Sequence, residues 1–269
     1  MNARNAEHAP RFRTLHAHGV LRLANAWDAG SARLIESLGA PAIATTSAGV
    51  AWAHGYVDGD ALPIERLLDT VAEIARVIHV PLTVDMEGGY SEDPAVVATH
   101  VVRAAEAGAV GINIEDGGGS TGALCAKLAR IPDALATRGL DVYVNARTDV
   151  YLRGLASSEA RVAMVLERAA LYRDAGADGL FVPGVTEAGA IGDIASAAGL
   201  PLNVMLRPSL PPLAELEALG VRRLSAGSDL AEAMFAYMGQ LAGAFLEDGR
   251  AVPGERMAYG EVNALFADR

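Results

Sequence analysis

The chain has 269 residues, of which 51% are hydrophobic and 29 are glycine, and its formal net charge at pH 7 is -11. This acidic balance argues against sequence-independent binding to nucleic-acid phosphates or anionic membranes. One cysteine, Cys125, excludes an internal disulfide framework, and the sequence lacks the run of about 18 apolar residues that a membrane span needs. We therefore expect a cytoplasmic protein with no nucleic-acid or membrane partner.

Strands and helices are predicted to alternate along the chain, because apolar runs of strand length are followed by segments of helical periodicity that end at glycine. A short helix is expected first, at residues 12–18. The predicted strands are 20–25, 41–47, 82–87, 110–114, 141–146, 179–184, 200–205 and 221–225. The predicted helices that follow them are 31–38, 63–78, 94–107, 123–138 (interrupted by Pro132), 157–175, 186–198, 213–219 and 229–241.

Eight such units predict a (β/α)8 barrel, in which functional groups lie at the carboxyl ends of the strands. No stretch of linker composition divides the chain, so we expect a single domain over residues 1–269. An amphipathic segment at 251–268 has no place in the eight units. We therefore predict that residues 242–269 form a terminal helical arm that packs on a partner subunit.

Polar clusters follow three of the predicted strands. The third strand ends in L-T-V-D-M-E-G-G-Y, where Asp85 and Glu87 are two residues apart and share a face. The fourth ends at Glu115 and Asp116 before three glycines, and the fifth ends in N-A-R-T-D, which contains Arg147. The acids could simply cap the helices that follow. Gathered at one end of a sheet, however, they predict a site organised by a cation or an anionic ligand.

A loop of small and hydroxylic residues is predicted after the second strand, at residues 45–49, where backbone N–H groups can approach a ligand closely. Asp58 lies in the next loop. Asp28 follows the first strand and is expected to cap the helix at 31–38.

With these residues in place, the chain resembles the isocitrate lyase and phosphoenolpyruvate mutase superfamily. The resemblance rests on N-A-W-D-A, T-S-A-G-V-A, G-Y-V-D-G, P-L-T-V-D-M-E-G-G-Y, G-I-N-I-E-D and N-A-R-T-D, which occur in this order over about residues 20–230. It implies a Mg²⁺ ion, with Mn²⁺ as an alternative, that is held mainly by Asp85. Asp58, Glu87 and Glu115 would reach the ion directly or through water.

The resemblance also implies a small anionic 2-oxo acid as substrate and an enolate intermediate. Arg147 would pair with the developing negative charge or with a second acidic group, so that Arg147, Asp58 and Glu115 form the catalytic set. Substrate contacts are implied for Thr46, Ser47, Ala48, Asp85, Arg147 and Asn203. The family's terminal helix exchange implies a homodimer or homotetramer.

Two differences from the isocitrate and methylisocitrate lyases of the superfamily reduce the number of activities that the sequence supports. The K-[KR]-C-G-H motif of isocitrate and methylisocitrate lyases is missing, and Cys125 has no Gly-His after it. The glutamate that those lyases place after the sixth strand is replaced by Gly184. An oxaloacetate-type decarboxylase tolerates these losses best. The alternatives are an enzyme of C–P bonds, of the phosphonopyruvate hydrolase or phosphoenolpyruvate mutase type, and a catalytically silent 2-oxo acid binding protein.

Overall fold

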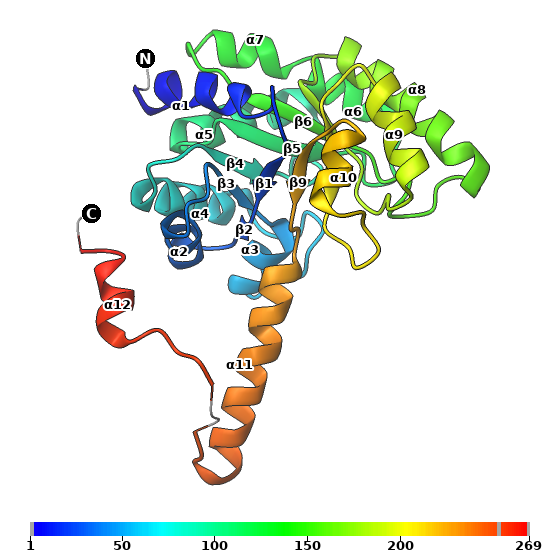
Figure 1. Ribbon diagram of the computed structural model, residues 1–269. Helices are drawn as coiled ribbons and strands as arrows, with labels where there is room; N and C mark the ends of the chain where they lie inside the picture. Colours follow the sequence, from blue (N-terminus) through cyan, green and yellow to red (C-terminus); the bar gives the residue numbers. More distant parts are fainter. Residues whose placement is uncertain (1–2, 252–253, 268–269) are drawn as a thin grey trace.

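The fold is a nearly closed barrel of parallel strands with helices around it (Figure 1). The structure is a computed structural model that describes residues 3–251 and 254–267. Within these residues, nine parallel strands pair in the order β1-β9-β8-β7-β6-β5-β4-β3-β2. β1 (Leu21–Leu23) pairs with β9 (Val221–Ser225), whereas β2 (Asn25–Ala26) pairs with β3 (Ile43–Thr45). β1 and β2 thus share the first strand position, and the predicted (β/α)8 architecture is confirmed.

The other elements alternate around this barrel. The remaining strands are β4 (Leu82–Asp85), β5 (Gly111–Glu115), β6 (Tyr143–Arg147), β7 (Gly179–Phe181) and β8 (Leu202–Met205). The helices are α1 (Ala3–Thr14), α2 (Ala29–Ser37), α3 (Ser47–Ala53), α4 (Ile64–Val77), α5 (Pro94–Ala107), α6 (Thr121–Leu128), α7 (Ile131–Ala136), α8 (Arg161–Asp174), α9 (Ala188–Ala197), α10 (Leu213–Ala218), α11 (Asp229–Asp248) and α12 (Tyr259–Ala264). Among the described residues, no helix combines the length and apolarity needed to cross a bilayer.

The main core lies between the strands and the surrounding helices. Ile112 and Ile114 of β5 point outward and are completely buried, as are Ile74 of α4 and Val101 of α5. Alternate residues of each strand point into the barrel instead. Near the carboxyl ends these inward residues are polar, which places the functional groups of successive strands around one axis.

Helix α1 covers the amino end of the barrel. Phe12 is completely buried, and its ring meets the rings of His16 and Tyr143 edge to face, with centroids 4.8 and 5.8 Å away. His16 stacks on Tyr143 with centroids 4.1 Å apart. A second apolar cluster, distinct from the main core, forms around them from Ala9, Leu21, Leu23, Ala42, Ala44 and Val110. This end of the barrel is therefore filled by side chains.

Two predictions near the amino terminus were wrong. The first helix does not cover residues 12–18 but runs from Ala3 to Thr14, because Asn5 and His8 turn a buried polar face toward the barrel and hide the expected apolar pattern. The predicted loop at 45–49 is instead the junction of β3 and α3, because Thr45 ends the strand, Thr46 is the N-cap and Ser47 begins the helix, whose residues Ser47 to Ala51 are all buried. The predicted cap is confirmed, since the Asp28 carboxylate accepts the Ser31 N–H at 2.7 Å.

Two predicted helices have different bounds. The helix at 123–138 is divided into α6 and α7, and Pro132 lies in the first turn of α7, where a missing N–H leaves no hydrogen bond unmade. Ser120 caps α6 by accepting the Ala123 N–H at 3.2 Å. The helix at 157–175 begins as a short 3-10 turn, Ser158–Ala160, before α8.

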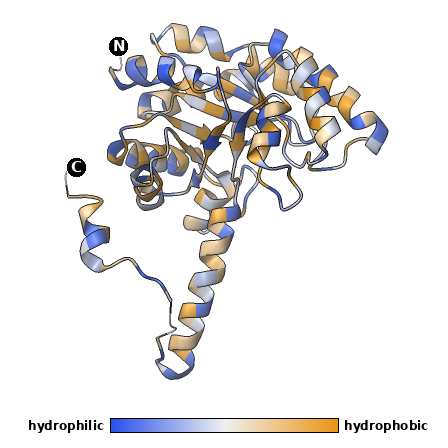
Figure 2. Ribbon diagram, in the orientation of Figure 1, coloured by the Kyte–Doolittle hydropathy of each residue, from blue (hydrophilic) through white to orange (hydrophobic). Residues whose placement is uncertain are grey.

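The carboxyl-terminal arm differs most from the prediction. α11 continues to Asp248 instead of ending at 241 and extends away from the barrel (Figure 1). Apolar residues recur along its length (Figure 2). The predicted helix at 251–268 is reduced to α12, and Val252, Pro253 and Asp268 lie outside the described residues. Beyond α12, the Leu265 carbonyl accepts the Arg33 Nε–H at 2.8 Å, which returns the arm to α2.

Candidate active site

A cavity of about 140 Å³ lies at the carboxyl ends of the strands. It is lined by Asn25, Thr46, Ser47, Ala48, Asp58, Asp85, Asn113, Arg147, Leu152, Phe181, Met205, Arg207, Ser225, Gly227 and Ser228. Six of the predicted site residues are among them: Thr46, Ser47, Ala48, Asp58, Asp85 and Arg147. A second cavity, of about 470 Å³, is lined by other residues, Glu87 and Glu115 among them.

Asp85 is a buried carboxylate at the end of β4. Its backbone N–H donates to Thr45 Oγ1 at 2.9 Å, which fixes the strand end against β3. Its Oδ1 accepts the Glu87 backbone N–H at 3.4 Å. Burial raises the pKa of Asp85, and the positive charge of Arg147 partly offsets that rise. In the described part of the chain Asp85 makes no ion pair, so its negative charge is available to a bound cation.

Glu87 holds the loop that carries Asp58. Its Oε2 accepts the Gly59 N–H at 2.8 Å and also the Asp60 N–H, while its Oε1 accepts the Tyr90 hydroxyl at 2.7 Å. Burial raises the pKa of Glu87, and the hydrogen bond from Tyr90 opposes that shift. With both oxygens occupied, Glu87 positions the exposed Asp58 over the cavity.

Backbone strain is concentrated in the same two loops. Asp60, Glu87 and Tyr90 have φ of 56°, 49° and 60°. Within the described residues they are the three non-glycine residues with a positive φ, a backbone conformation that side chains other than glycine rarely adopt. The two loops are joined in both directions, because the Asp60 carboxylate accepts the N–H groups of Gly88 and Tyr90 at 3.2 and 3.1 Å. Such conformations persist where surrounding hydrogen bonds fix them, and they cluster at functional sites.

Arg147 forms the opposite wall of the cavity. Its Nη1 lies 2.5 Å from Glu115 Oε2, and its Nε lies 2.8 Å from Asp149 Oδ1. Burial disfavours the charged guanidinium, but Glu115 and Asp149 outweigh burial and keep the pKa of Arg147 above its usual value. Burial raises the pKa of Glu115 to about 8, although Arg147 opposes the shift.

Asp116, the neighbour of Glu115, anchors this wall to α8. It accepts Arg168 Nη1 at 2.5 Å and the Tyr172 hydroxyl at 2.6 Å, and its other oxygen accepts the Asp149 N–H at 3.1 Å. The Asp116 and Asp149 side chains have no exposed surface. The two acids therefore fix the position from which Arg147 reaches the cavity.

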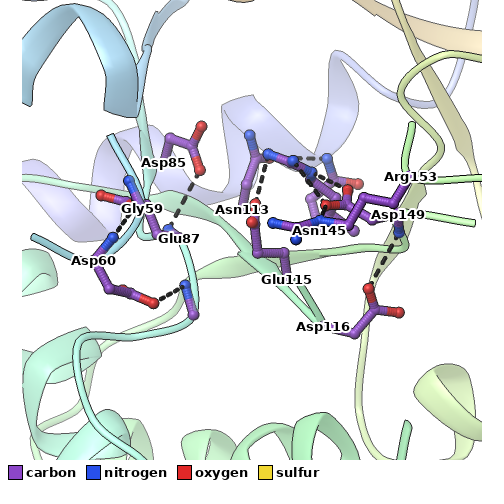
Figure 3. A network of polar contacts seen from close by, with 12 residues as sticks. Gly59, Asp60, Asp85, Glu87, Asn113, Glu115, Asp116, Asn145, Asp149 and Arg153 are labelled. Atoms are coloured by element: carbon purple, nitrogen blue, oxygen red, sulfur yellow. Dashed lines mark hydrogen bonds and ion pairs between the residues drawn. The ribbon is translucent and has the colours of Figure 1, made fainter. Parts of the chain in front are cut away.

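Beneath the cavity, amide side chains from neighbouring strands interlock. Asn145 donates to Asn113 Oδ1 at 2.9 Å, and Figure 3 shows Asn113 between Asp85 and Asn145. The predicted site residue Asn203 is 1% exposed and does not line the cavity; its Oδ1 accepts the Ser225 hydroxyl at 3.0 Å.

The sequence-based site missed Asn113, Arg207, Ser225 and the buried Arg223. Asn113 and Asn145 lie two residues before Glu115 and Arg147, so strand periodicity places them on the same inner face. That signal was available. Arg222 and Arg223 lie on opposite faces of their strand, but their shared residue type does not tell which of them points into the barrel.

The acids allow a metal ion with few protein ligands. Among the described residues, no group of three or more His, Cys, Asp or Glu side chains is arranged to hold a metal ion. Glu87 and Glu115 already bind other groups, which leaves Asp85 and Asp58 around the cavity. Mg²⁺ commonly takes one or two carboxylates and keeps several waters. The donor set therefore fits Mg²⁺ with Asp85 as the principal ligand.

Comparison with known proteins gives a consistent picture. The family model for phosphoenolpyruvate phosphomutase matches residues 12–246. An uncharacterised protein of Mycobacterium tuberculosis is 35% identical over 259 residues, which cover 96% of each chain. An oxaloacetate decarboxylase of Paraburkholderia xenovorans is 32% identical over 227 residues, which span 80% of this chain and 73% of the decarboxylase. A crystal structure from Burkholderia cenocepacia, described as a candidate phosphonomutase, has a TM-score of 0.83 and 38% identity over 88% of this chain and 99% of its own.

Proposed function

Because the chain belongs to the phosphoenolpyruvate phosphomutase family, within the isocitrate lyase and phosphoenolpyruvate mutase superfamily, we propose that it is a Mg²⁺-dependent lyase or decarboxylase. The substrate would be a small 2-oxo or 2-hydroxy dicarboxylate. One observation carries the proposal: buried Asp85, which has no ion-pair partner in the described chain, and Arg147 line the same small cavity. A cation and an anionic ligand together satisfy this arrangement.

Asp85 would hold the ion, and Asp58 at the same cavity would act through its water ligands. Glu87 would position the Asp58 loop, and Glu115 would position Arg147. When bound, Mg²⁺ or Mn²⁺ supplies Lewis-acid stabilisation of negative charge on substrate oxygens. Arg147 contributes a planar guanidinium, which Glu115 and Asp149 hold in one orientation. Its role is to stabilise charge that develops as the substrate bond breaks. Thr46, Ser47 and Ala48 bind the substrate carboxylate from the other side.

A second arginine side chain also lines the cavity. Arg207, on the loop after β8, lines the cavity and makes no ion pair in the described part of the chain. An arginine without a carboxylate partner favours a substrate with a second acidic group. This supports a dicarboxylate over a monocarboxylate.

The departures from isocitrate lyases have structural counterparts. Cys125 is half-buried on α6 and is not part of the cavity wall, and burial raises its pKa, which opposes the thiolate. Gly184 has φ 89°, and a Cβ there would lie 3.1 Å from the Leu152 nitrogen. A glutamate at this position would be strained and crowded. We therefore favour decarboxylation, for which metal, guanidinium and a proton source suffice.

The proposal is tested by incubating the protein with oxaloacetate and a panel of substituted malates, with Mg²⁺, with Mn²⁺ and with EDTA. We expect metal-dependent release of pyruvate or a related 2-oxo acid from at least one of them. Absence of turnover across the whole panel would reject the C–C activity. Calorimetry with oxalate then tests for binding. Metal-dependent binding of oxalate without turnover of any substrate would identify a catalytically silent 2-oxo acid binding protein.

A second activity is favoured by one comparison. The candidate phosphonomutase of Burkholderia cenocepacia is matched over 99% of its chain, which makes C–P chemistry on phosphonopyruvate the alternative. Arg147 and Arg207 suit a phosphonate as well as a carboxylate. Phosphate release or isomerisation of phosphonopyruvate, measured in the same assay, distinguishes this activity.

We further propose that the chain forms a homodimer or homotetramer through its terminal arm. α11 exposes Met234, Phe235, Met238, Phe245 and Leu246, with exposed fractions from 48% to 81%. Tyr259 of α12 is 84% exposed. Large apolar side chains gathered on an extended arm are typical of a surface that another subunit covers.

A further inference from the structure

Arg223 on β9 is a fully buried arginine inside the barrel. It is 1% exposed and is the largest fully buried side chain among the described residues. In the described chain no carboxylate forms an ion pair with it, and burial lowers its pKa to about 10, an effect that Tyr143 and Asp85 oppose. A buried guanidinium without an acid is costly, so its retention needs a reason beyond packing.

The contacts of Arg223 lead to the floor of the cavity. Its Nη2 donates to Asn113 Oδ1 at 3.1 Å, and its Nε donates to Ser225 Oγ at 3.4 Å. Asn145 Nδ2 donates to the same Asn113 oxygen at 2.9 Å. Two donors thus occupy both lone pairs of Asn113 Oδ1.

This arrangement fixes the orientation of the Asn113 amide. Because its oxygen faces Arg223 and Asn145, its Nδ2 must point the other way, and Asn113 lines the cavity. Within the described residues, Nδ2 has no acceptor. The amide therefore presents N–H donors to whatever occupies the cavity, beside Asp85 and Arg147.

We propose that Arg223 is a positioning residue, which locks the Asn113 amide so that its N–H group donates to an anionic oxygen of the bound substrate. This inference rests on the proposed function for the identity of the ligand, but the locked amide itself does not. Arg223 acts from beneath the site and does not touch the ligand. Its charge, with no carboxylate partner, adds positive potential where the ligand's negative charge lies.

A residue that only fills the barrel floor would behave differently. Loss of packing lowers stability but has no particular connection to Asn113. If Arg223 acts through Asn113, removal of either residue should weaken ligand binding, and removal of the second should add little. The strand offers a matched control, since the adjacent Arg222 donates to the Val221 carbonyl and lies on the other face.

The binding test uses calorimetry with oxalate and Mg²⁺ on Arg223→Met, Asn113→Ala, the double variant and Arg222→Met. We expect Arg223→Met and Asn113→Ala each to weaken binding by about tenfold or more, as for the loss of a hydrogen bond to a charged group. The double variant should be no more than about twofold weaker than either single variant, and Arg222→Met should match the wild type. Independent, multiplicative losses would overturn the proposal.

A ligand-free test separates this inference from the proposed function. The Asn113 side-chain amide signal in ¹H–¹⁵N spectra is assigned by its absence in Asn113→Ala. We expect that signal to be displaced in Arg223→Met and in Arg223→Lys, which keeps the charge but has no planar fork, and to be unchanged in Arg222→Met. An unmoved signal in the Arg223 variants would overturn the proposal. If the wild type binds no oxalate, the proposed function fails while these spectra still decide the role of Arg223.

Discussion

Glu115 and Arg147 face each other across the paired strands β5 and β6, with Oε2 2.5 Å from Nη1. The two residues are directly opposite in the strand register, so the backbone itself brings them together. Their side chains are 13% and 15% exposed, which makes this pair part of the barrel interior. Arg147 thus approaches the cavity in a fixed orientation set by a neighbouring strand.

Replacing Arg147 should lower the stability of the fold. Arg147→Met leaves the carboxylates of Glu115 and Asp149 without their buried partner, so we expect a loss of about 3–5 kcal/mol in the free energy of unfolding. Urea denaturation measures this loss. Arg153→Met is the control, because Arg153 also contacts Asp149 at 3.0 Å but is 54% exposed; its loss should stay within about 1 kcal/mol. Equal effects in the two variants would contradict the buried role of Arg147.

Asp85→Asn should separate stability from metal binding. Burial raises the pKa of Asp85, because keeping the ionised carboxylate away from water costs free energy that a neutral amide does not cost. We expect the neutral amide to raise thermal stability while it abolishes Mg²⁺-dependent binding of oxalate. Glu92→Gln, at a side chain that is 96% exposed, should change neither. Unaltered oxalate affinity in Asp85→Asn would remove the basis of the metal assignment.

Asp116 should matter for folding although it lies beside the site. Asp116→Asn removes the buried charge that the partly buried Arg168 and the Tyr172 hydroxyl contact, and we expect the free energy of unfolding to fall by about 3–5 kcal/mol. Asp174→Asn provides the comparison, because it breaks an exposed ion pair with Arg173 and should have an effect below about 1 kcal/mol. Denaturant titrations of both variants test the contrast.

His16 should make stability depend on pH. Burial lowers the pKa of His16 to about 3 in the folded protein, from an ordinary value of 6.5. The unfolded chain therefore binds the proton more readily, and stability should fall as pH drops below 6.5, by about 2 kcal/mol between pH 7 and pH 5. His16→Gln should remove this component, whereas the exposed His18→Gln should retain it. A pH profile that His16→Gln leaves unchanged would refute the assignment.

The exposed arm should control assembly. We expect light scattering to give a dimer or tetramer for the wild type. Met238→Glu introduces charge into the apolar surface of α11 and should shift the mass toward a monomer, because a charge buried at an interface lacks compensation. Gln240→Glu adds the same charge at another exposed position and should have a smaller effect. A monomeric wild type would contradict the proposal.

Much of the barrel could be predicted because its signals are local. Asp85, Glu115 and Arg147 end apolar runs of strand length, and that position alone implies the rim of a parallel barrel. Helix lengths were less predictable. The last helix of the barrel was predicted to end at residue 241, but α11 continues to Asp248, where Gly249 with φ 72° ends it.

The support beneath the site could not be predicted, because it depends on which face of a strand each residue occupies. Arg222 and Arg223 look equivalent in V-R-R-L-S, yet the former is half-buried outside the barrel and the latter is buried within it. The pairing of Asp116 with Arg168 and Tyr172 likewise joins residues more than 50 positions apart. Only the folded arrangement brings them into contact.

Helix α1 closes the amino end of the barrel with Phe12 and His16. A ligand can therefore reach the cavity only from the carboxyl side. A reaction product must then depart by the route through which the next reactant arrives. Because substrate and product share this opening, product that accumulates in the cavity should inhibit competitively.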